Sequence, residues 1–298
     1  MISALLSAII LGLIQGAVIG LVALGIVLVY KGSRVFNFAQ AELGTVAAFF
    51  LYFLIDVVNV NYFVALPLAL IGIGIVGFLL ERLIVRPLFD APRVTMLVAT
   101  AGVTLLFIAL ELIIGHTQTR ILAKAADGTA FTILTVSFTY QRMIVIAAVV
   151  GLAIASAWFF NKTDLGLAVL ATSQEPVATE LVGIGTRRIS SFVWVSAAVL
   201  GGIAGVLQGP DTLLYPGMMT REFLLLGLTA AVLGGITSLS GAFIGGLLIG
   251  GLNGLGSWAQ GQFTASIGAI PAFPEVLVFV VLLAVLSVRP QGLFGAEA

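Results

Sequence analysis

The sequence predicts an all-α membrane protein, a polytopic helical bundle of about eight or nine transmembrane helices, some of them broken or re-entrant. Charged residues make up 9% of the chain and hydrophobic residues 60%, with a mean hydropathy of +1.21. Soluble domains contain about 25% charged residues. Long stretches such as Met143–Asn161 and Phe223–Pro274 carry no charge. A bilayer accommodates such stretches, because about 20 apolar residues cross it as a helix.

Charge-free stretches place the predicted spans along the chain. The first stretch, Met1–Tyr30, lacks the basic start and short apolar core of a secretory signal, so we interpret it as a retained first span. Several later stretches are short, which predicts tilted or re-entrant helices. The candidate spans are Ala4–Val29, Phe36–Ile55, Tyr62–Leu80, Thr95–Gly115, Met143–Phe160, Ser191–Leu207, Phe223–Ile236, Ala242–Trp258 and Phe273–Val288.

The second span must carry polar residues into the membrane. The apolar stretch between Glu42 and Asp56 is too short to cross, so the span has to include Asn37, Gln40 and Glu42. Such groups are costly at membrane depth unless they are partnered or wetted. Two interpretations stay open: a polar helix start held at the inner interface by capping and headgroups, or the lining of a pathway at a broken helix. The candidate pathway residues are Asn37, Phe38, Gln40 and Glu42.

Small residues recur at the spacing that lets helix backbones approach closely in lipid. The sets are Gly12/Gly16/Gly20, Gly201/Gly205, Gly241/Gly245 and Gly246/Gly250/Gly254. We expect them to pack helices inside one bundle, with a subunit seam or a pore lining as the alternative.

A polar segment, 161–188, lies between two apolar stretches and predicts a short helix. Thr172–Glu175 fits a capping box, Pro176 suits the first turn, and Gly183 and Gly185 end the helix. The apolar stripe would comprise Val177, Ala178, Leu181 and Val182, with Thr179 and Glu180 turned away. Such a helix either rests on lipid or fits a groove on a soluble subunit.

Basic residues predict the orientation, because they are enriched on the cytoplasmic side. With loops 31–35, 81–93 and 161–188 and the C-terminus inside, nine of the 13 Lys and Arg residues lie inside and four outside. Nine spans then place the N-terminus outside. His116–Gln141 becomes the largest outer loop and shows no strong motif. Further charges near membrane ends are Glu81, Arg82, Glu111, Asp211, Arg221, Glu222 and Glu275.

Composition argues against several function classes. The chain has no cysteine and a single histidine, His116, which argues against thiol catalysis and histidine-rich metal sites. A net charge of zero gives no electrostatic footprint for nucleic acid. Gly72–Gly77 matches a dinucleotide motif but lies inside an apolar run without a preceding strand. The sequence contains no phosphate-binding loop, so we expect the chain not to bind ATP itself.

Four segments in order resemble the permeases of branched-chain amino acid ABC importers, the shorter of the two usual membrane subunits. They are Ala23–Lys31 with Val35–Glu42, Gly166–Gly183, Leu233–Gly246 and Arg289–Gly295. The resemblance covers nearly the whole chain. It implies a single transmembrane permease domain, 1–298, with a cytoplasmic coupling segment, 161–188. The candidate residues for coupling to the ATPase are Thr172, Gln174, Glu175, Ala178, Glu180 and Gly183.

The same resemblance implies a transport function in a bacterial cytoplasmic (inner) membrane. A periplasmic binding protein would deliver branched-chain or related amino acids, and two cytoplasmic ATPase subunits would bind ATP, so no cofactor is expected in this chain. A homologous second permease would complete the pore as a heterodimer. This subunit would not be an enzyme.

Two alternatives remain for the function. An autonomous secondary transporter or channel for a small polar solute would carry charges deep in several spans, whereas Glu42 is the main candidate here. An ABC permease for amides or urea is the other alternative, since the wider family includes such substrates.

Overall fold

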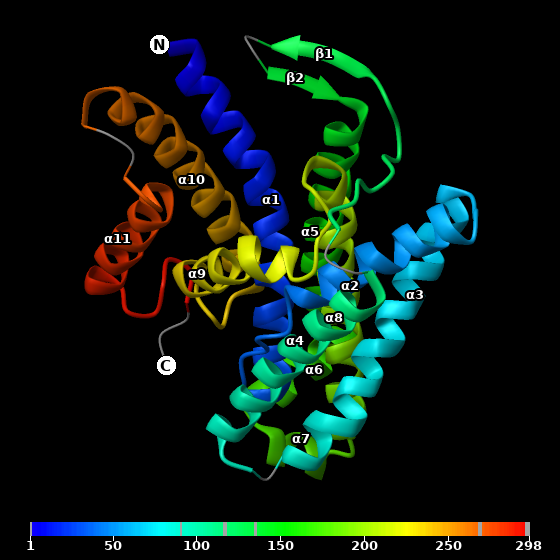
Figure 1. Ribbon diagram of the computed structural model, residues 1–298. Coiled ribbons are helices and arrows are strands. Elements are labelled where there is room, and N and C mark those ends of the chain that lie inside the picture. The colour runs from blue at the N-terminus through cyan, green and yellow to red at the C-terminus, as the bar shows by residue number, and fades with distance from the viewer. Residues whose placement is uncertain (1, 90, 116–117, 134–135, 268–269, 296–298) are drawn as a thin grey trace. The chain divides into compact units, whose positions relative to one another are not determined.

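The computed structural model describes residues 2–89, 91–115, 118–133, 136–267 and 270–295 (Figure 1). The chain divides into two compact units. Unit 1 comprises Met1–Ala23, Lys124–Ala153 and Leu226–Ala298, and unit 2 comprises Leu24–Ala123 and Ile154–Leu225. Helices α1 (Ile2–Ser33) and α5 (Tyr140–Lys162) each contribute residues to both units.

Six helices within the described ranges are long and apolar enough to cross a membrane. This confirms the prediction of a polytopic helical membrane protein. The six segments are Ser3–Ser33, Tyr62–Leu88, Arg93–Gly115, Tyr140–Lys162, Thr186–Asp211 and Leu239–Gln262. A shorter apolar helix, Phe273–Val288, coincides with the ninth candidate span. Large apolar side chains such as Val98, Ile113 and Ile154 are exposed on these helices, as lipid contact requires.

Unit 2 holds most of the polar residues singled out above. Its further elements are α2 (Glu42–Tyr52), the π-helix η1 (Phe53–Val57), α3 (Tyr62–Leu80), the π-helix η2 (Glu81–Val85), η3 (Arg86–Leu88), α4 (Arg93–Gly115), α6 (Asp164–Gln174), α7 (Pro176–Leu181), α8 (Thr186–Gln208), η4 (Gly209–Asp211) and the π-helix η5 (Thr220–Leu224). Helix α8 packs against both α2 and α3 and forms the centre of this unit.

Two of the expected spans are not continuous helices. Helix α1 ends at Ser33, and Arg34 follows it in a left-handed conformation (φ 56°). A non-helical connection comes next, so helix α2 begins only at Glu42. The span expected over Phe223–Ile236 contains α9 (Leu225–Gly234), a helix of ten residues that ends before Gly235 (φ 104°). Both helices are too short to cross a bilayer alone, as the prediction of broken spans requires.

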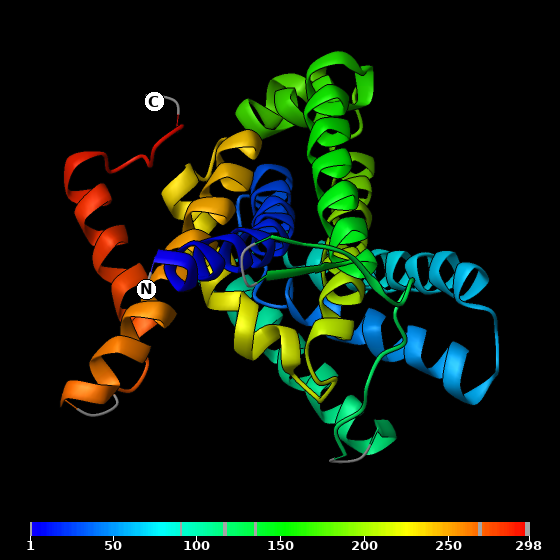
Figure 2. The same ribbon diagram turned by 90° about the horizontal axis from the view of Figure 1, so that it is seen from above.

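Unit 1 is built around a glycine seam between α1 and α10 (Leu239–Ile267). Both views show the two helices side by side (Figures 1 and 2). A Cβ on Gly16 would lie 2.8 Å from the carbonyl oxygen of Gly246 and 3.1 Å from the Cα of Gly250. The predicted close approach of helix backbones is therefore confirmed here. Helix α11 (Phe273–Val288) packs against α10.

A β-hairpin in unit 1 is a feature that the sequence does not predict. Strands β1 (Thr129–Ile133) and β2 (Val136–Thr139) pair antiparallel, with Phe131 opposite Phe138. The two rings stack at a centroid distance of 4.9 Å. The expected outer loop His116–Gln141 thus contains ordered strands, although residues 116, 117, 134 and 135 lie outside the described residues.

Candidate functional site

The connection between α1 and α2, residues 34–41, is folded by its own polar side chains. The Asn37 Oδ1 atom accepts a hydrogen bond from the backbone N–H of Ala39 at 3.0 Å. The backbone N–H of Gln40 donates to the carbonyl oxygen of Asn37 at 3.2 Å. An Asn side chain that bonds its own backbone two residues on stabilises a turn in place of a helix. The connection therefore delays the start of α2 to Glu42.

Gln40 fixes this connection between two helices. Its Nε2 atom donates to the carbonyl oxygen of Ala197 on α8 at 2.8 Å. A Cβ on Gly25 of α1 would overlap the Gln40 amide, and one on Gly201 of α8 would lie 3.0 Å from Nε2. These two glycines therefore make the space in which a buried amide is held.

The first turn of α2 is bonded to the start of η5 and to Met219, the residue before it. The Thr220 hydroxyl donates to Glu42 Oε2, and the backbone N–H of Met219 donates to Thr45 Oγ1 at 3.1 Å. Glu42, Thr45 and Met219 are fully buried. Protein partners thus hold Glu42 Oε2 and Thr45 Oγ1, whereas the buried Oε1 atom of Glu42 has no hydrogen-bond partner among the described residues.

The structure brings the four candidate pathway residues together in one connection. Asn37, Gln40 and Glu42 are buried and Phe38 is half-buried. Their hydrogen-bond partners lie on α8, α4 and η5. Their role in a pathway stays a prediction.

The polar segment 161–188 forms two helices, and the capping box expected at Thr172–Glu175 is wrong. Thr163 is the N-cap of α6, because its Oγ1 accepts from the backbone N–H of Gly166 at 3.0 Å. Helix α6 therefore runs through Thr172, whose hydroxyl donates to the carbonyl oxygen of Ala168 at 2.8 Å. Pro176 does lie in the first turn of α7, as predicted. The chain then leaves α7 at Gly183 (φ 88°).

Helix α7 presents its apolar stripe outward. Val177 is 71% exposed and Leu181 is 84% exposed, with Ala178 and Val182 also exposed beside them. Thr179 is buried on the opposite side, and its hydroxyl donates to the carbonyl oxygen of Glu175 at 2.7 Å. An exposed apolar patch of this kind marks a surface that another molecule or a membrane covers.

The candidate coupling residues are likewise divided into buried and exposed ones. Thr172 is buried, and the other candidates are exposed: Gln174, Glu175, Ala178, Glu180 and Gly183. The Glu180 carboxylate accepts a hydrogen bond from the Thr186 hydroxyl at the start of α8. Five candidates are thus accessible to a partner, whereas Thr172 acts only inside α6. Their role in coupling stays a prediction.

Arg34 joins the connection 34–41 to the polar segment. Its guanidinium donates to the carbonyl oxygen of Ser173, in the last turn of α6. A cation at this place satisfies a carbonyl that has no partner within the helix and complements the helix dipole. The contact links the polar segment physically to the residues that precede α2.

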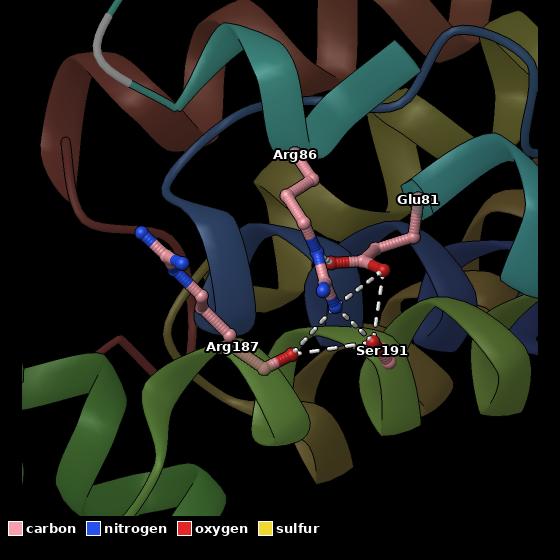
Figure 3. Close-up of polar contacts among 4 residues, drawn as sticks. All are labelled: Glu81, Arg86, Arg187 and Ser191. Atoms are coloured by element: carbon pink, nitrogen blue, oxygen red, sulfur yellow. Dashed lines mark hydrogen bonds and ion pairs between the residues drawn. The ribbon is translucent and has the colours of Figure 1, made fainter. Parts of the chain in front are cut away.

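A second polar cluster fixes the end of α3 to the start of α8 (Figure 3). Arg86 binds the buried carboxylate of Glu81 through two hydrogen bonds, of 3.2 Å from Nε and 3.1 Å from Nη2. Ser191 donates to Glu81 Oε2 at 2.8 Å and accepts from Arg86 Nη2 at 2.8 Å. The Arg187 carbonyl oxygen accepts from the same Arg86 nitrogen at 3.4 Å, while the Arg187 side chain points away from the cluster.

Sequence reasoning missed this pair because Glu81 and Arg86 are five residues apart. That spacing places the two side chains on different faces of an α-helix. The π-helix η2 closes an i→i+5 bond from the Arg86 backbone N–H to the Glu81 carbonyl, which brings the two residues into line. A π-turn therefore creates the ion pair.

The chain is similar to known transport permeases over most of its length. The family model described as "Branched-chain amino acid transport system / permease component" matches residues 8–286. A permease protein of a high-affinity branched-chain amino acid transport system, BraD of Pseudomonas aeruginosa, is 26% identical over 95% of this chain and 94% of its own length. The probable branched-chain amino acid transport permease LivH of Methanocaldococcus jannaschii is 26% identical over 96% of this chain and 92% of its own length.

A sugar permease is also similar. The xylose/arabinose import permease XylH of Sulfolobus acidocaldarius is 27% identical over 63% of this chain and 53% of its own length. No solved structure matches the chain. Since the family model covers nearly the whole sequence, the protein belongs to the family of permease components of branched-chain amino acid transport systems.

Proposed function

We propose that this protein is the translocating subunit of an ABC importer for branched-chain or related amino acids in a bacterial inner membrane. The match of the family model over residues 8–286 carries the proposal. A periplasmic binding protein delivers the substrate, two cytoplasmic ATPase subunits hydrolyse ATP, and a homologous permease supplies the other wall of the pathway. This subunit breaks no covalent bond. Its part is to expose a pathway alternately to each side.

Force from ATP hydrolysis enters through the outward face of α7. This face is apolar and accessible. It belongs to the polar segment 161–188, in which Thr163 caps α6 and Pro176 begins α7. A helix of this kind fits a groove on a soluble subunit. From α7 the displacement passes through α6 and the contact between Arg34 and Ser173 to the connection 34–41.

Reconstitution tests the proposed function directly. The purified protein alone in liposomes is expected to accumulate no leucine. With the second permease, the two ATPase subunits, the binding protein and ATP, the vesicles should accumulate it. A non-hydrolysable ATP analogue is the control and should leave the vesicles empty. Accumulation of leucine by the protein alone would contradict the proposal, and the same assay with amides, urea or xylose separates the remaining substrate classes.

Arg34→Ala is expected to uncouple transport from ATP hydrolysis. The substitution removes the contact with the carbonyl oxygen of Ser173 but leaves the exposed face of α7 unchanged. ATPase subunits should still co-purify, while uptake per ATP hydrolysed falls by about tenfold, the equivalent of about 1.4 kcal/mol. Arg188→Ala is the control, since Arg188 is an exposed arginine at the end of the polar segment 161–188. Equal coupling ratios in the two variants would contradict the route through Arg34.

A further inference from the structure

Two carboxyl groups meet inside unit 2. Glu42 is the first residue of α2 and Glu111 lies in α4, and both carboxyls bind the same short segment, Glu111 at Gly217 and Glu42 at Thr220. Glu42 is 0% exposed and Glu111 is 6% exposed. Two buried carboxyls held by one short segment are unusual, because two negative charges close together repel each other strongly in a low dielectric.

The hydrogen-bond donors around the pair do not satisfy both groups. Glu42 Oε2 accepts from the Thr220 hydroxyl, and Glu111 Oε2 accepts from the backbone N–H of Gly217 at 3.0 Å. The other oxygen of each carboxyl, Oε1, is buried and has no hydrogen-bond partner among the described residues. An ionised carboxylate only accepts, so two ionised groups facing each other would leave both Oε1 atoms without a donor.

Among the described residues, no ion pair or hydrogen bond joins a basic side chain to either carboxyl. The ion pair of this unit is that of Arg86 with Glu81, and the donors to the pair are the Thr220 hydroxyl and the Gly217 N–H. Glu222 is engaged elsewhere, because it accepts a hydrogen bond from Tyr215 at 2.8 Å, and Arg221 lies over the ring of Tyr215. Arg120, which follows α4, donates instead to the Tyr52 hydroxyl and the Gly115 carbonyl oxygen. The other charged residues on the elements packed around the pair are Asp56 on η1, Glu81 and Arg82 on η2, Arg93 on α4, and Arg187 and Arg188 on α8.

We propose that Glu42 and Glu111 form a proton-binding site, in which a single proton is shared between the two carboxyls at neutral pH. A proton on one Oε1 atom supplies the missing donor and satisfies the facing Oε1 as its acceptor. The pair then carries one negative charge, which the Thr220 hydroxyl and the Gly217 N–H stabilise. The hydrogen bonds of the protonated pair join three parts of unit 2: the start of α2, α4 and the segment 217–220.

Loss of this proton places two like charges between α2 and α4. Because the folded protein binds a proton that two ionised carboxyls in an unfolded chain release, stability falls as the pH rises through the titration of the pair. The proton therefore acts as a pH-sensitive latch on the first turn of α2. This inference concerns the chain by itself and does not depend on its substrate or partners.

Infrared spectroscopy of the full-length protein in lipid nanodiscs tests the inference. At pH 7 the wild type should show the carbonyl stretching band of a protonated carboxylic acid, with the intensity of one group per chain. The band should shift in deuterium oxide and disappear at alkaline pH. It should be absent from the Glu42→Gln/Glu111→Gln double variant, which keeps the size of both side chains. Glu275→Gln, at an exposed carboxyl in the first turn of α11, should leave the band unchanged.

The outcomes separate a proton from a metal cation. Absence of the band from the wild type at pH 7 overturns the proposal without any variant. A melting temperature that depends on sodium concentration at constant pH, together with a missing band, would assign the site to a sodium ion instead. The melting temperature of the wild type should fall between pH 7 and pH 9 relative to that of the double variant. If the melting temperatures of the wild type and the double variant change with pH in the same way, the proposal is also overturned.

Discussion

Gly205→Ala is expected to destabilise the protein by about 3 kcal/mol, the upper end of the usual cost of overpacking. A Cβ at this position of α8 would lie 2.6 Å from the Cα of Gly44 and closer still to its carbonyl group. The obstructing atoms belong to the backbone of α2, so no side-chain rotation relieves the overlap. Helices α2 and α8 would have to move apart, and with them Gln40 and its bond to Ala197.

Thermal unfolding of the purified protein in detergent measures this effect. Gly102→Ala is the matched control, because a Cβ on this exposed glycine of α4 meets no atom within 4 Å. The control should gain about 0.5–1 kcal/mol, as alanine is favoured over glycine within a helix. If both variants unfold at the wild-type temperature, the close contact of α2 and α8 is wrong.

Leu181→Glu is expected to abolish binding of the ATPase subunits, on the proposed function. Leu181 is the most exposed residue of the apolar stripe on α7, and a carboxylate there would be buried without a partner in an apolar groove. A loss of about 100-fold or more in affinity is expected for a central interface residue. Co-purification of the ATPase subunits measures binding, and uptake into vesicles should fall with it.

Ile121→Glu is the control for this substitution. Ile121 is a large apolar residue with 73% exposure, in the loop after α4 that we place on the other side of the membrane. This variant should insert and bind the ATPase subunits as the wild type does. Normal ATPase binding by Leu181→Glu, or equal losses in the two variants, would contradict a docking role for α7.

The sequence predicts the spans well where hydropathy alone decides. Uninterrupted apolar runs, such as those that form α3 and α11, appear as helices at or near the expected bounds. The glycine spacing of α1 and α10 predicts backbone contact because small residues have few other uses in a lipid-facing helix. These features depend on residues that are close together in the sequence.

The remaining features depend on competition between local signals or on distant partners. The Asn37 side chain competes with the helix for the backbone of Ala39, so α2 starts later than hydropathy suggests. Thr172 fits the pattern of a helix cap, but in the structure Thr163 caps α6 and Thr172 lies inside that helix. From the sequence, Glu111 is only a charged residue near the end of a span. Its proximity to Glu42 cannot be predicted, because the two residues are far apart in the sequence.

The seam between α1 and α10 has a mechanical consequence. Larger side chains of two packed helices interdigitate as ridges in grooves. Sliding one helix along the other then requires many side chains to change rotamer. At Gly12, Gly16, Gly246 and Gly250 the two helices are in contact through backbone atoms, and these residues have no side chains that would have to rearrange. Such a contact holds the two helices at a constant separation and still permits shear along their axes. We therefore expect shear between α1 and α10 to require fewer side-chain rearrangements than shear at a contact between larger residues.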